Sequence, residues 1–302
     1  MKVGQTFSSQ RQRSMLLPIV SIIWLCAAGA GASERVEENV VYGMYSGLAL
    51  ALDVHYPAES NNHGVLMIPG SGWHNPGNGY GDRELKAGYD YINEVRDVLV
   101  RRGFTVFVAN HRSAPRFRYP AAVEDARRAV RFIRHHASRF SIDAARLGAL
   151  GHSSGGHLVS LLGVEDVTGE EKDDPVEGES SKVQAVVAIA APHDMTVWEA
   201  YGLSFAVSFM GERPPTDARR VFLKEGHYAE ASPVSYVTSD DASFLLIHGT
   251  EDAVVSPKQL GIMDTALRDA GVAVESISVE GGSHSPELDH EGIVEWFETH
   301  LL

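Results

Sequence analysis

The chain has 302 residues, of which 22% are charged and 44% hydrophobic, and its 26 Lys and Arg against 40 Asp and Glu give a net charge of −14. This composition excludes a disordered or collagen-like chain, and a single cysteine excludes a disulfide scaffold and a cysteine-ligated zinc module. The acidic balance argues against a nucleic-acid partner, because proteins that bind nucleic acid need surplus Lys and Arg.

Residues 1–32 have the layout of a secretory signal peptide. Positive charges come first, the uncharged run 15–26 follows, and the small residues 27–32 offer A-x-A cleavage sites. A membrane anchor is the alternative, but Pro18 interrupts an apolar run shorter than the ~20 residues of a spanning helix. Bulky residues before Cys26 argue against lipidation there. We therefore expect cleavage, a secreted or periplasmic protein, and no stable membrane anchor.

Residues 33–302 contain no repeat and no linker rich in Pro, Gly or Ser, so we predict one domain. Apolar and polar residues alternate over 48–57, as expected of an antiparallel strand with one solvated face. Later strands are predicted from short, mostly apolar runs bounded by Gly, Pro or polar residues, at 65–68, 104–109, 147–150, 183–190 and 244–247. Such runs are typical of parallel strands buried on both faces.

Helical patterns separate these runs. Residues 92–103 and 122–134 each carry an apolar stripe, and Ser256 and Pro257 precede a third stripe that ends at Gly271. Alternating strands and helices predict an α/β fold with right-handed crossovers in a mostly parallel, doubly wound sheet. Such sheets bind ligands beyond the carboxyl ends of their strands, so functional residues should directly follow the apolar runs.

The run that ends at Leu150 is followed by Gly151-His152-Ser153-Ser154-Gly155, a G-x-S-x-G sequence between a strand and a helix. In this context the serine lies on a strained turn, and the glycines let the strand and the helix approach closely enough to present its hydroxyl. A plain glycine-rich turn is the alternative. We predict that Ser153 is a nucleophile.

A serine hydroxyl needs a base to take its proton, and the base needs a carboxylate to hold its tautomer. Asp252 lies in the turn beyond the run 244–247. His284 lies on a loop after the next strand, at about 272–279. The chain order Ser153, Asp252, His284 is the order expected for a catalytic triad on this kind of sheet.

Each member has a competitor. Glu251 is adjacent to Asp252 and Asp194 lies beyond the run 183–190, so either could be the acid while Asp252 only caps its turn. Among the other histidines, His290 is the nearest alternative base, but it lies where the closing helix begins.

An enzyme that transfers acyl groups also needs donors for the developing oxyanion. The turn after the run 65–68 reads Pro69-Gly70-Ser71-Gly72-Trp73, and its small residues let backbone N–H groups approach a ligand. We predict an oxyanion hole built from the N–H groups of Ser71 and Gly72 and that of Ser154. An ordinary turn is the alternative.

At these residues the chain resembles the α/β hydrolases, and more narrowly their bacterial carboxylesterase and hormone-sensitive-lipase-like branch, which is similar to acetylxylan and feruloyl esterases. Three stretches carry the resemblance: 110–126, which begins Asn-His-Arg-Ser-Ala-Pro, 142–161, and 231–252. It implies an α/β-hydrolase fold over about 41–302. Two positions depart from the family pattern, because Pro69 replaces its usual histidine and Ser71 its middle glycine.

Residues 195–228 interrupt the alternation of strands and helices, and we predict a small cap there whose aromatic residues mainly pack. The acidic stretch 165–179 is interpreted as a solvated surface loop. The chain has 14 histidines but no H-E-x-x-H or similar cluster, so we predict neither a metal nor a cofactor.

These observations predict a secreted serine carboxylesterase for small acyl esters, and the resemblance implies acetylated or feruloylated carbohydrate as the substrate class. A serine peptidase of the prolyl-oligopeptidase type is an alternative with the same residue order, although nothing here resembles its propeller. A non-catalytic binding protein with the hydrolase fold is the other alternative. No oligomeric state is predicted.

Overall fold

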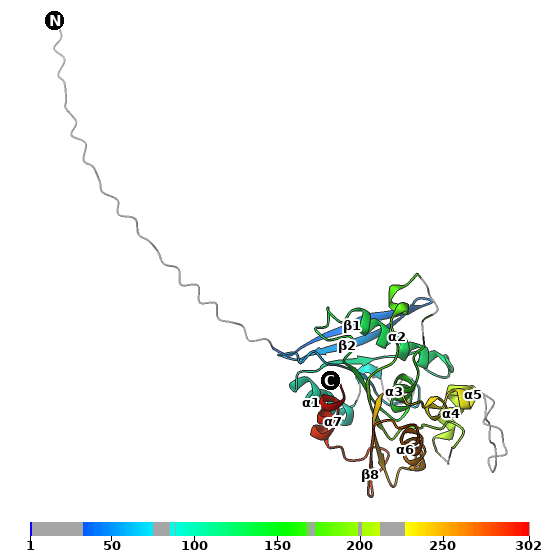
Figure 1. Ribbon diagram of the computed structural model, residues 1–302. Helices are drawn as coiled ribbons and strands as arrows, with labels where there is room; N and C mark the ends of the chain where they lie inside the picture. The colour runs from blue at the N-terminus through cyan, green and yellow to red at the C-terminus, as the bar shows by residue number, and fades with distance from the viewer. Residues whose placement is uncertain are drawn as a thin grey trace. The chain divides into compact units, whose positions relative to one another are not determined.

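Among the residues that the computed structural model describes, eight strands form one mixed sheet in the order β1-β2-β4-β3-β5-β6-β7-β8. Figure 1 labels its two edge strands, β1 and β8. The sheet belongs to the compact unit Ala32–Leu302. The described residues are 1, 33–74, 85–87, 89–167, 169, 173–198, 201–211 and 227–301. The predicted leader therefore lies outside the described residues, as do parts of the predicted cap.

The sheet is antiparallel at its N-terminal edge and parallel elsewhere. β1 (Arg35–Tyr45) pairs with β2 (Leu48–Tyr56), and β2 pairs with β4 (Thr105–Ala109), both in antiparallel register. The strands that run parallel with β4 are β3 (Gly64–Ile68), β5 (Leu147–His152), β6 (Ala185–Ile189), β7 (Ser243–Gly249) and β8 (Val274–Val279). The predicted fold class and the predicted strands are confirmed.

The sequence pattern does not predict β1. Most of its side chains are exposed, and its pairing with β2 shifts register between Glu37 and Val40 and again between Val41 and Gly43. These shifts break the regular alternation by which a strand is recognised in a sequence.

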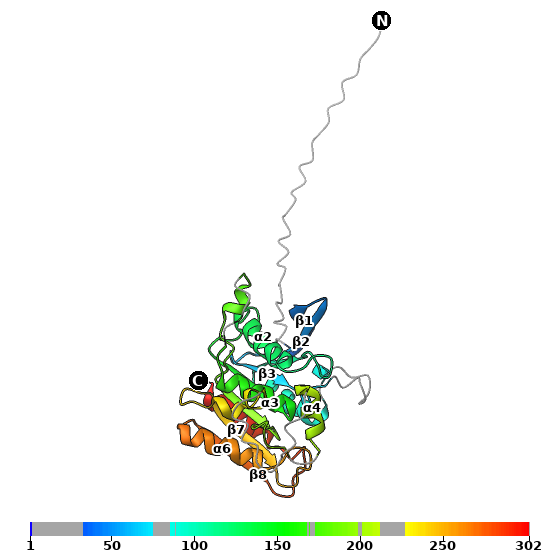
Figure 2. The ribbon, with the colours of Figure 1, turned by 90° about the vertical axis from the view of Figure 1, so that its right-hand side faces the viewer.

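Helices cover both faces of the sheet. The helices α1 (Asp90–Arg101) and α7 (His290–His300) pack on one face, and α2 (Ala121–His135), α3 (Ser154–Val164) and α6 (Lys258–Ala270) pack on the other (Figures 1 and 2). Successive residues of a strand point to opposite faces, so Leu66 of β3 joins the core with α2 and α3 while Val65 joins the core with α1 and α7. Two buried faces explain why these strands are uniformly apolar.

The helix boundaries agree with the sequence pattern except at the start of α6. This helix begins at Lys258, and Pro257 precedes it with φ −57° and ψ −17°. Its end is as predicted, because Gly271 adopts the left-handed conformation with φ 79° and closes the helix. In the part of the chain that is described, no helix is long and apolar enough to cross a membrane.

The acidic stretch after α3 is not simply solvated, which corrects the interpretation from the sequence. Glu165 pairs with Arg127 at 2.7 Å, and Asp174 pairs with Arg128 at 2.6 Å. These carboxylates therefore tie their loop to the arginine-rich side of α2.

Candidate active site

Ser153 lies between the end of β5 and the start of α3, with φ 55° and ψ −122°. Residues other than glycine rarely adopt positive φ, so this turn is strained. The Ser153 N–H donates to the Ile189 carbonyl at 2.8 Å, and the Ser153 carbonyl accepts the His157 N–H at 3.0 Å. The strand, turn and helix predicted around the serine are therefore present, and the turn is held from both sides.

Position 151, two residues before Ser153, must be glycine for steric reasons. A Cβ on Gly151 would lie 2.4 Å from the backbone of Gly155, closer than non-bonded carbon atoms approach. The strand and the helix can therefore meet at this turn only because Gly151 has no side chain.

The imidazole of His284 joins Ser153 to Asp252. His284 Nε2 lies 3.0 Å from Ser153 Oγ, and His284 Nδ1 lies 2.8 Å from Asp252 Oδ2. The other carboxylate oxygen, Oδ1, accepts the N–H groups of Val254 and Val255 at 2.8 and 3.0 Å. Residues from three distant parts of the chain thus form one hydrogen-bonded line.

Asp252 is buried, with 7% of its surface exposed. Burial opposes ionisation, but hydrogen bonds from His248, at 3.1 Å, and from His284 hold the pKa of the Asp252 carboxyl well below its usual value. The carboxylate is therefore charged near neutral pH and accepts a hydrogen bond from the Nδ1–H group of His284. That tautomer leaves Nε2 free to take the Ser153 proton.

The competing residues lie elsewhere. Glu251 is exposed. Asp194 Oδ1 accepts the N–H and the hydroxyl of Thr196 at 2.9 and 2.6 Å, so Asp194 stabilises a local turn. His290 begins α7, with Nε2 3.9 Å from a carboxylate oxygen of Glu94. The structure therefore brings only Asp252 and His284 to Ser153 among the predicted alternatives.

The loops that carry the acid and the base pack backbone to backbone. A Cβ on Gly249, at the end of β7, would lie 2.2 Å from the Gly282 carbonyl oxygen. That carbonyl accepts the Glu251 N–H at 2.8 Å, and Val279, at the end of β8, accepts the Thr250 N–H at 3.0 Å. This close packing fixes Asp252 relative to the loop of His284.

A second histidine, to which the sequence assigned no role, adjoins this line. His152 Nε2 lies 2.7 Å from the carbonyl oxygen of His284, and the two ring centroids are 4.8 Å apart. His152 Nδ1 is hydrogen-bonded to the Tyr89 hydroxyl. Burial, together with the nearby His284, lowers the pKa of His152 to about 4, so its ring is neutral near pH 7.

The oxyanion loop, residues 69–73, follows β3 and adjoins the start of α3. The Ser71 N–H donates to Ser154 Oγ at 3.0 Å, which corrects the prediction that Ser71 offers a free donor. Among the described residues, the N–H groups of Gly72 and Ser154 have no backbone acceptor. Two of the three predicted donors therefore remain available to a ligand.

Helix α4 (Leu203–Met210), within the predicted cap, packs on the oxyanion loop. A Cβ on Gly72 would lie 2.5 Å from the ring of Phe205. The ring of Phe209 stacks on Trp73, with centroids 4.5 Å apart and planes 8° from parallel. The aromatic side chains of α4 thus pack against the loop, as predicted, and cover it.

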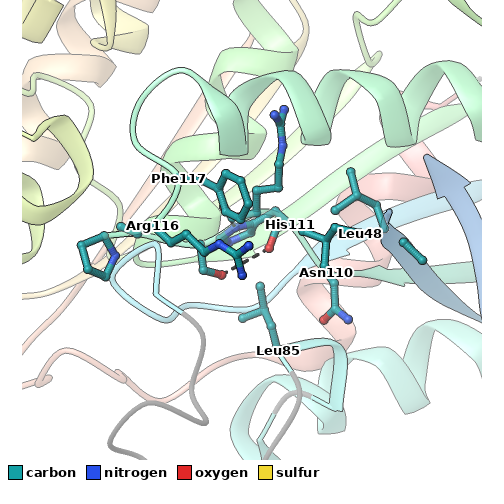
Figure 3. A pocket seen from close by; sticks show the side chains of 12 residues that line it. Leu48, Leu85, Asn110, His111, Arg116 and Phe117 are labelled. Atoms are coloured by element: carbon teal, nitrogen blue, oxygen red, sulfur yellow. Dashed lines mark hydrogen bonds between the residues drawn. The ribbon is translucent and has the colours of Figure 1, made fainter. Parts of the chain in front are cut away.

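A pocket of about 580 Å³ lies next to this loop (Figure 3). Its lining comes from the start of β2, from Leu85 and from residues 110–117, and Figure 3 shows Phe117 on one side and Leu48 on the other. The neighbouring Ala114 donates its N–H to the Trp73 carbonyl at 2.8 Å, so one wall is joined to the oxyanion loop. The lining is both aromatic and polar, and it includes no residue of the triad or of the oxyanion loop.

Among the described residues, no three His, Cys, Asp or Glu side chains are grouped so that they could hold a metal ion. The prediction of a metal-free site stays a prediction.

A serine on a strained strand-to-helix turn, bonded through histidine to aspartate at the carboxyl edge of a mostly parallel sheet, defines an α/β hydrolase. Residues 52–267, more than two thirds of the chain, match the BD-FAE family model. The chain belongs to the BD-FAE family, within the hormone-sensitive-lipase-like α/β hydrolases. This confirms the resemblance drawn from the sequence.

Known esterases and carbohydrate esterases are similar to this chain. Esterase LipC of Mycobacterium tuberculosis is 26% identical over 226 residues, which cover 74% of this chain and 53% of that protein. The chain spans about half the length of the curated relatives it matches.

Two solved structures are similar over most of the chain. A truncated form of a carbohydrate esterase from gut microbiota is 26% identical with a TM-score of 0.71, covering 90% of this chain and 98% of that one. A bifunctional GH43-CE protein of Bacteroides eggerthii is 28% identical with a TM-score of 0.70, covering 88% of this chain and 35% of that one. Both likenesses agree with the α/β-hydrolase fold described above.

Proposed function

We propose that this chain is a serine hydrolase of carboxylic esters. The observation that carries the proposal is the hydrogen-bonded line in which His284 contacts both the Ser153 hydroxyl and the Asp252 carboxylate. The names of its relatives, esterases and carbohydrate esterases, support the same reaction class.

In the first half of the reaction Ser153 Oγ attacks the ester carbonyl while His284 Nε2 takes the hydroxyl proton. The negative charge that develops on the carbonyl oxygen receives hydrogen bonds from the N–H groups of Gly72 and Ser154. Asp252 stays ionised and stabilises the imidazolium. Collapse of the tetrahedral intermediate breaks the ester bond, and His284 returns the proton to the departing alcohol.

In the second half water attacks the acyl group on Ser153, with His284 as the base that takes a proton from the water. The same two N–H groups stabilise the second tetrahedral intermediate. Its collapse releases the carboxylic acid and returns the proton to Ser153 Oγ, so the enzyme is regenerated without a cofactor.

Replacement of the nucleophile tests this proposal. Ser153→Ala should lower kcat for p-nitrophenyl acetate on the order of 10⁴-fold or more and abolish labelling by a fluorophosphonate. Ser160→Ala is the matched control, because Ser160 is a buried serine of α3 whose hydroxyl bonds the Gly156 carbonyl at 2.7 Å. Unchanged turnover in Ser153→Ala would refute the mechanism.

The assembled triad also argues against a non-catalytic binding protein. Labelling by a fluorophosphonate would show that the protein has a reactive serine. Ester cleavage faster than peptide cleavage would then favour an esterase over a peptidase of the prolyl-oligopeptidase type. Peptide cleavage that exceeds ester cleavage would reverse this ranking.

For the substrate we propose small acyl esters of carbohydrates, first acetylated sugars, with feruloylated sugars as the second class to test. Coverage of the oxyanion loop by α4 supports a small acyl group, because Phe205 lies against Gly72. The neighbouring pocket, with Phe117 and Asn110 in its lining, offers the mixture of aromatic and polar surface that suits a sugar. The similar carbohydrate esterase supports the same substrate class.

We also propose that the protein is exported, on the strength of the signal-peptide layout of residues 1–32. Expression of the full chain followed by cell fractionation and N-terminal sequencing tests this. A protein retained in the cytoplasm with residues 1–32 intact would contradict export.

A further inference from the structure

A line of hydrogen bonds runs from Tyr89, at the start of α1, through His152 to the loop of His284. The Tyr89 hydroxyl is hydrogen-bonded to His152 Nδ1. On the other side of the same ring, His152 Nε2 lies 2.7 Å from the carbonyl oxygen of His284. Tyr89 and His152 thus link the start of α1 to the loop that carries His284.

The direction of each bond follows from the groups present. The carbonyl of His284 can only accept, so His152 Nε2 carries the ring proton. Nδ1 then holds a lone pair and accepts the hydrogen bond of the Tyr89 hydroxyl. These hydrogen bonds therefore select one tautomer of His152, in which the Nε2–H group points at the carbonyl of His284.

Two features favour these hydrogen bonds: space for the ring of His152 and its burial. A Cβ on Gly70 would lie 2.7 Å from His152 Nδ1, so only glycine admits the ring at this place. His152 is buried, with 4% of its surface exposed, and its ring is tilted against that of His284. A buried donor that is fully paired holds its acceptor more firmly than one that exchanges with water.

We propose that His152 and Tyr89 are positioning residues for the ester hydrolysis proposed above, on which this inference rests. By holding the carbonyl of His284, they keep its imidazole within hydrogen-bonding distance of the Ser153 hydroxyl. The loop before His284 needs such a contact because it contains Gly281 and Gly282, and glycine restricts the backbone least. Gly281 adopts φ 67°. Misplacing a catalytic group by about 1 Å can cost about 10²-fold in rate.

Two substitutions of His152 separate the hydrogen bond from the packing. His152→Phe keeps a ring but removes the donor, and we expect kcat for p-nitrophenyl acetate to fall about 10²-fold with little change in KM. His152→Gln places an amide N–H near the position of Nε2, and we expect it to restore most of this loss. Rescue by glutamine distinguishes a donor from a ring that only fills space.

His63→Phe is the matched control. His63 is a buried histidine with 8% exposure that directly precedes β3, at the opposite end of this strand from the oxyanion loop. We expect it to retain the kcat of the unmodified protein, whatever its effect on thermal stability.

Tyr89→Phe provides a second variant that removes one oxygen atom. Without the Tyr89 hydroxyl the proton of His152 can move to Nδ1, so the donor to His284 is lost in part, and we expect a smaller fall in kcat than in His152→Phe. If His152→Phe fails to fold, the Tyr89→Phe result decides the question.

The outcomes separate this inference from the proposed function. Failure of the unmodified protein to react with a fluorophosphonate would refute the serine mechanism itself. Labelling of the unmodified protein, combined with unchanged kcat in His152→Phe or in Tyr89→Phe, would refute only the positioning role. An equal loss of kcat in His152→Phe and His152→Gln would also refute it.

Discussion

Gly155 lies directly against the carbonyl of Ile68, where a Cβ on the glycine would be 1.8 Å from the carbonyl oxygen. Because the obstacle is backbone at the end of β3, it cannot turn aside as a side chain would. Gly155→Ala should therefore lower the free energy of unfolding by more than about 4 kcal/mol and disrupt the turn of Ser153. Urea unfolding and fluorophosphonate labelling measure both effects.

Gly261→Ala is the matched control for that prediction. Gly261 is an exposed residue inside α6, and a Cβ there meets no atom within 4 Å. Alanine should stabilise the helix by about 0.5–1 kcal/mol and leave turnover unchanged. A Gly155→Ala protein as stable as the Gly261→Ala protein would contradict the close approach of α3 to β3.

Two glycines around the turn of Ser153 explain why the nucleophile was predictable from the sequence. Gly151 and Gly155 are needed for steric reasons within a few residues of Ser153, so local sequence encodes that turn. The uniformly apolar strands were predictable for a similar reason, because burial on two faces leaves little choice of residue. Strand β1 was not, since an exposed edge strand with register shifts carries no regular pattern.

Asp252 should be indispensable for turnover. Asp252→Asn replaces the acceptor of the His284 Nδ1 proton by an amide that can donate, which favours the wrong tautomer of the imidazole. We expect kcat for p-nitrophenyl acetate to fall about 10⁴-fold while KM changes little.

Glu251→Gln is the control for Asp252→Asn, because Glu251 is the adjacent, exposed acid. It should keep the turnover of the unmodified protein. Loss of activity in Glu251→Gln, with activity retained in Asp252→Asn, would exchange the roles of the two residues.

Long-range contacts lie beyond such local patterns. Ser71 and Ser154 are 83 positions apart, and only the folded chain shows that the Ser154 hydroxyl takes the Ser71 N–H. The bond between His152 and the carbonyl of His284 spans 132 positions. A motif names residue types at fixed spacing, whereas a bond to a backbone carbonyl can be made under many sequences and leaves no signature.

Buried histidines should make the fold sensitive to mild acid. Burial lowers the pKa of His111, His152 and His157 to about 4, against an ordinary value of 6.5. Between these values the unfolded chain takes up protons that the folded chain refuses, so the free energy of unfolding falls as the pH drops from 6.5 to 4. Above pH 7 these groups are neutral in both states, and they cause no change.

Removing one of these histidines should weaken that dependence. His111→Gln should reduce the loss of stability between pH 7 and pH 5 by about 2 kcal/mol. Urea unfolding of both proteins at the two pH values measures this difference. An identical pH dependence in the variant would show that His111 is not neutral in the folded protein.

The pocket beside the oxyanion loop should bind the sugar part of a substrate. Phe117→Ala removes the aromatic surface of its lining, and we expect KM for an acetylated xylo-oligosaccharide to rise about fivefold, which corresponds to about 1 kcal/mol of lost contact. Hydrolysis of p-nitrophenyl acetate, which has no sugar to place there, should keep its KM and kcat.

Ile277→Ala provides the control for the pocket, because Ile277 lines a different cavity of about 470 Å³ between β8 and α7. It should leave KM unchanged for both substrates. The comparison of the two substrates matters more than the size of either effect, since a general loss of stability would impair them alike. If Phe117→Ala changes both KM values equally, or neither, the sugar does not bind in this pocket.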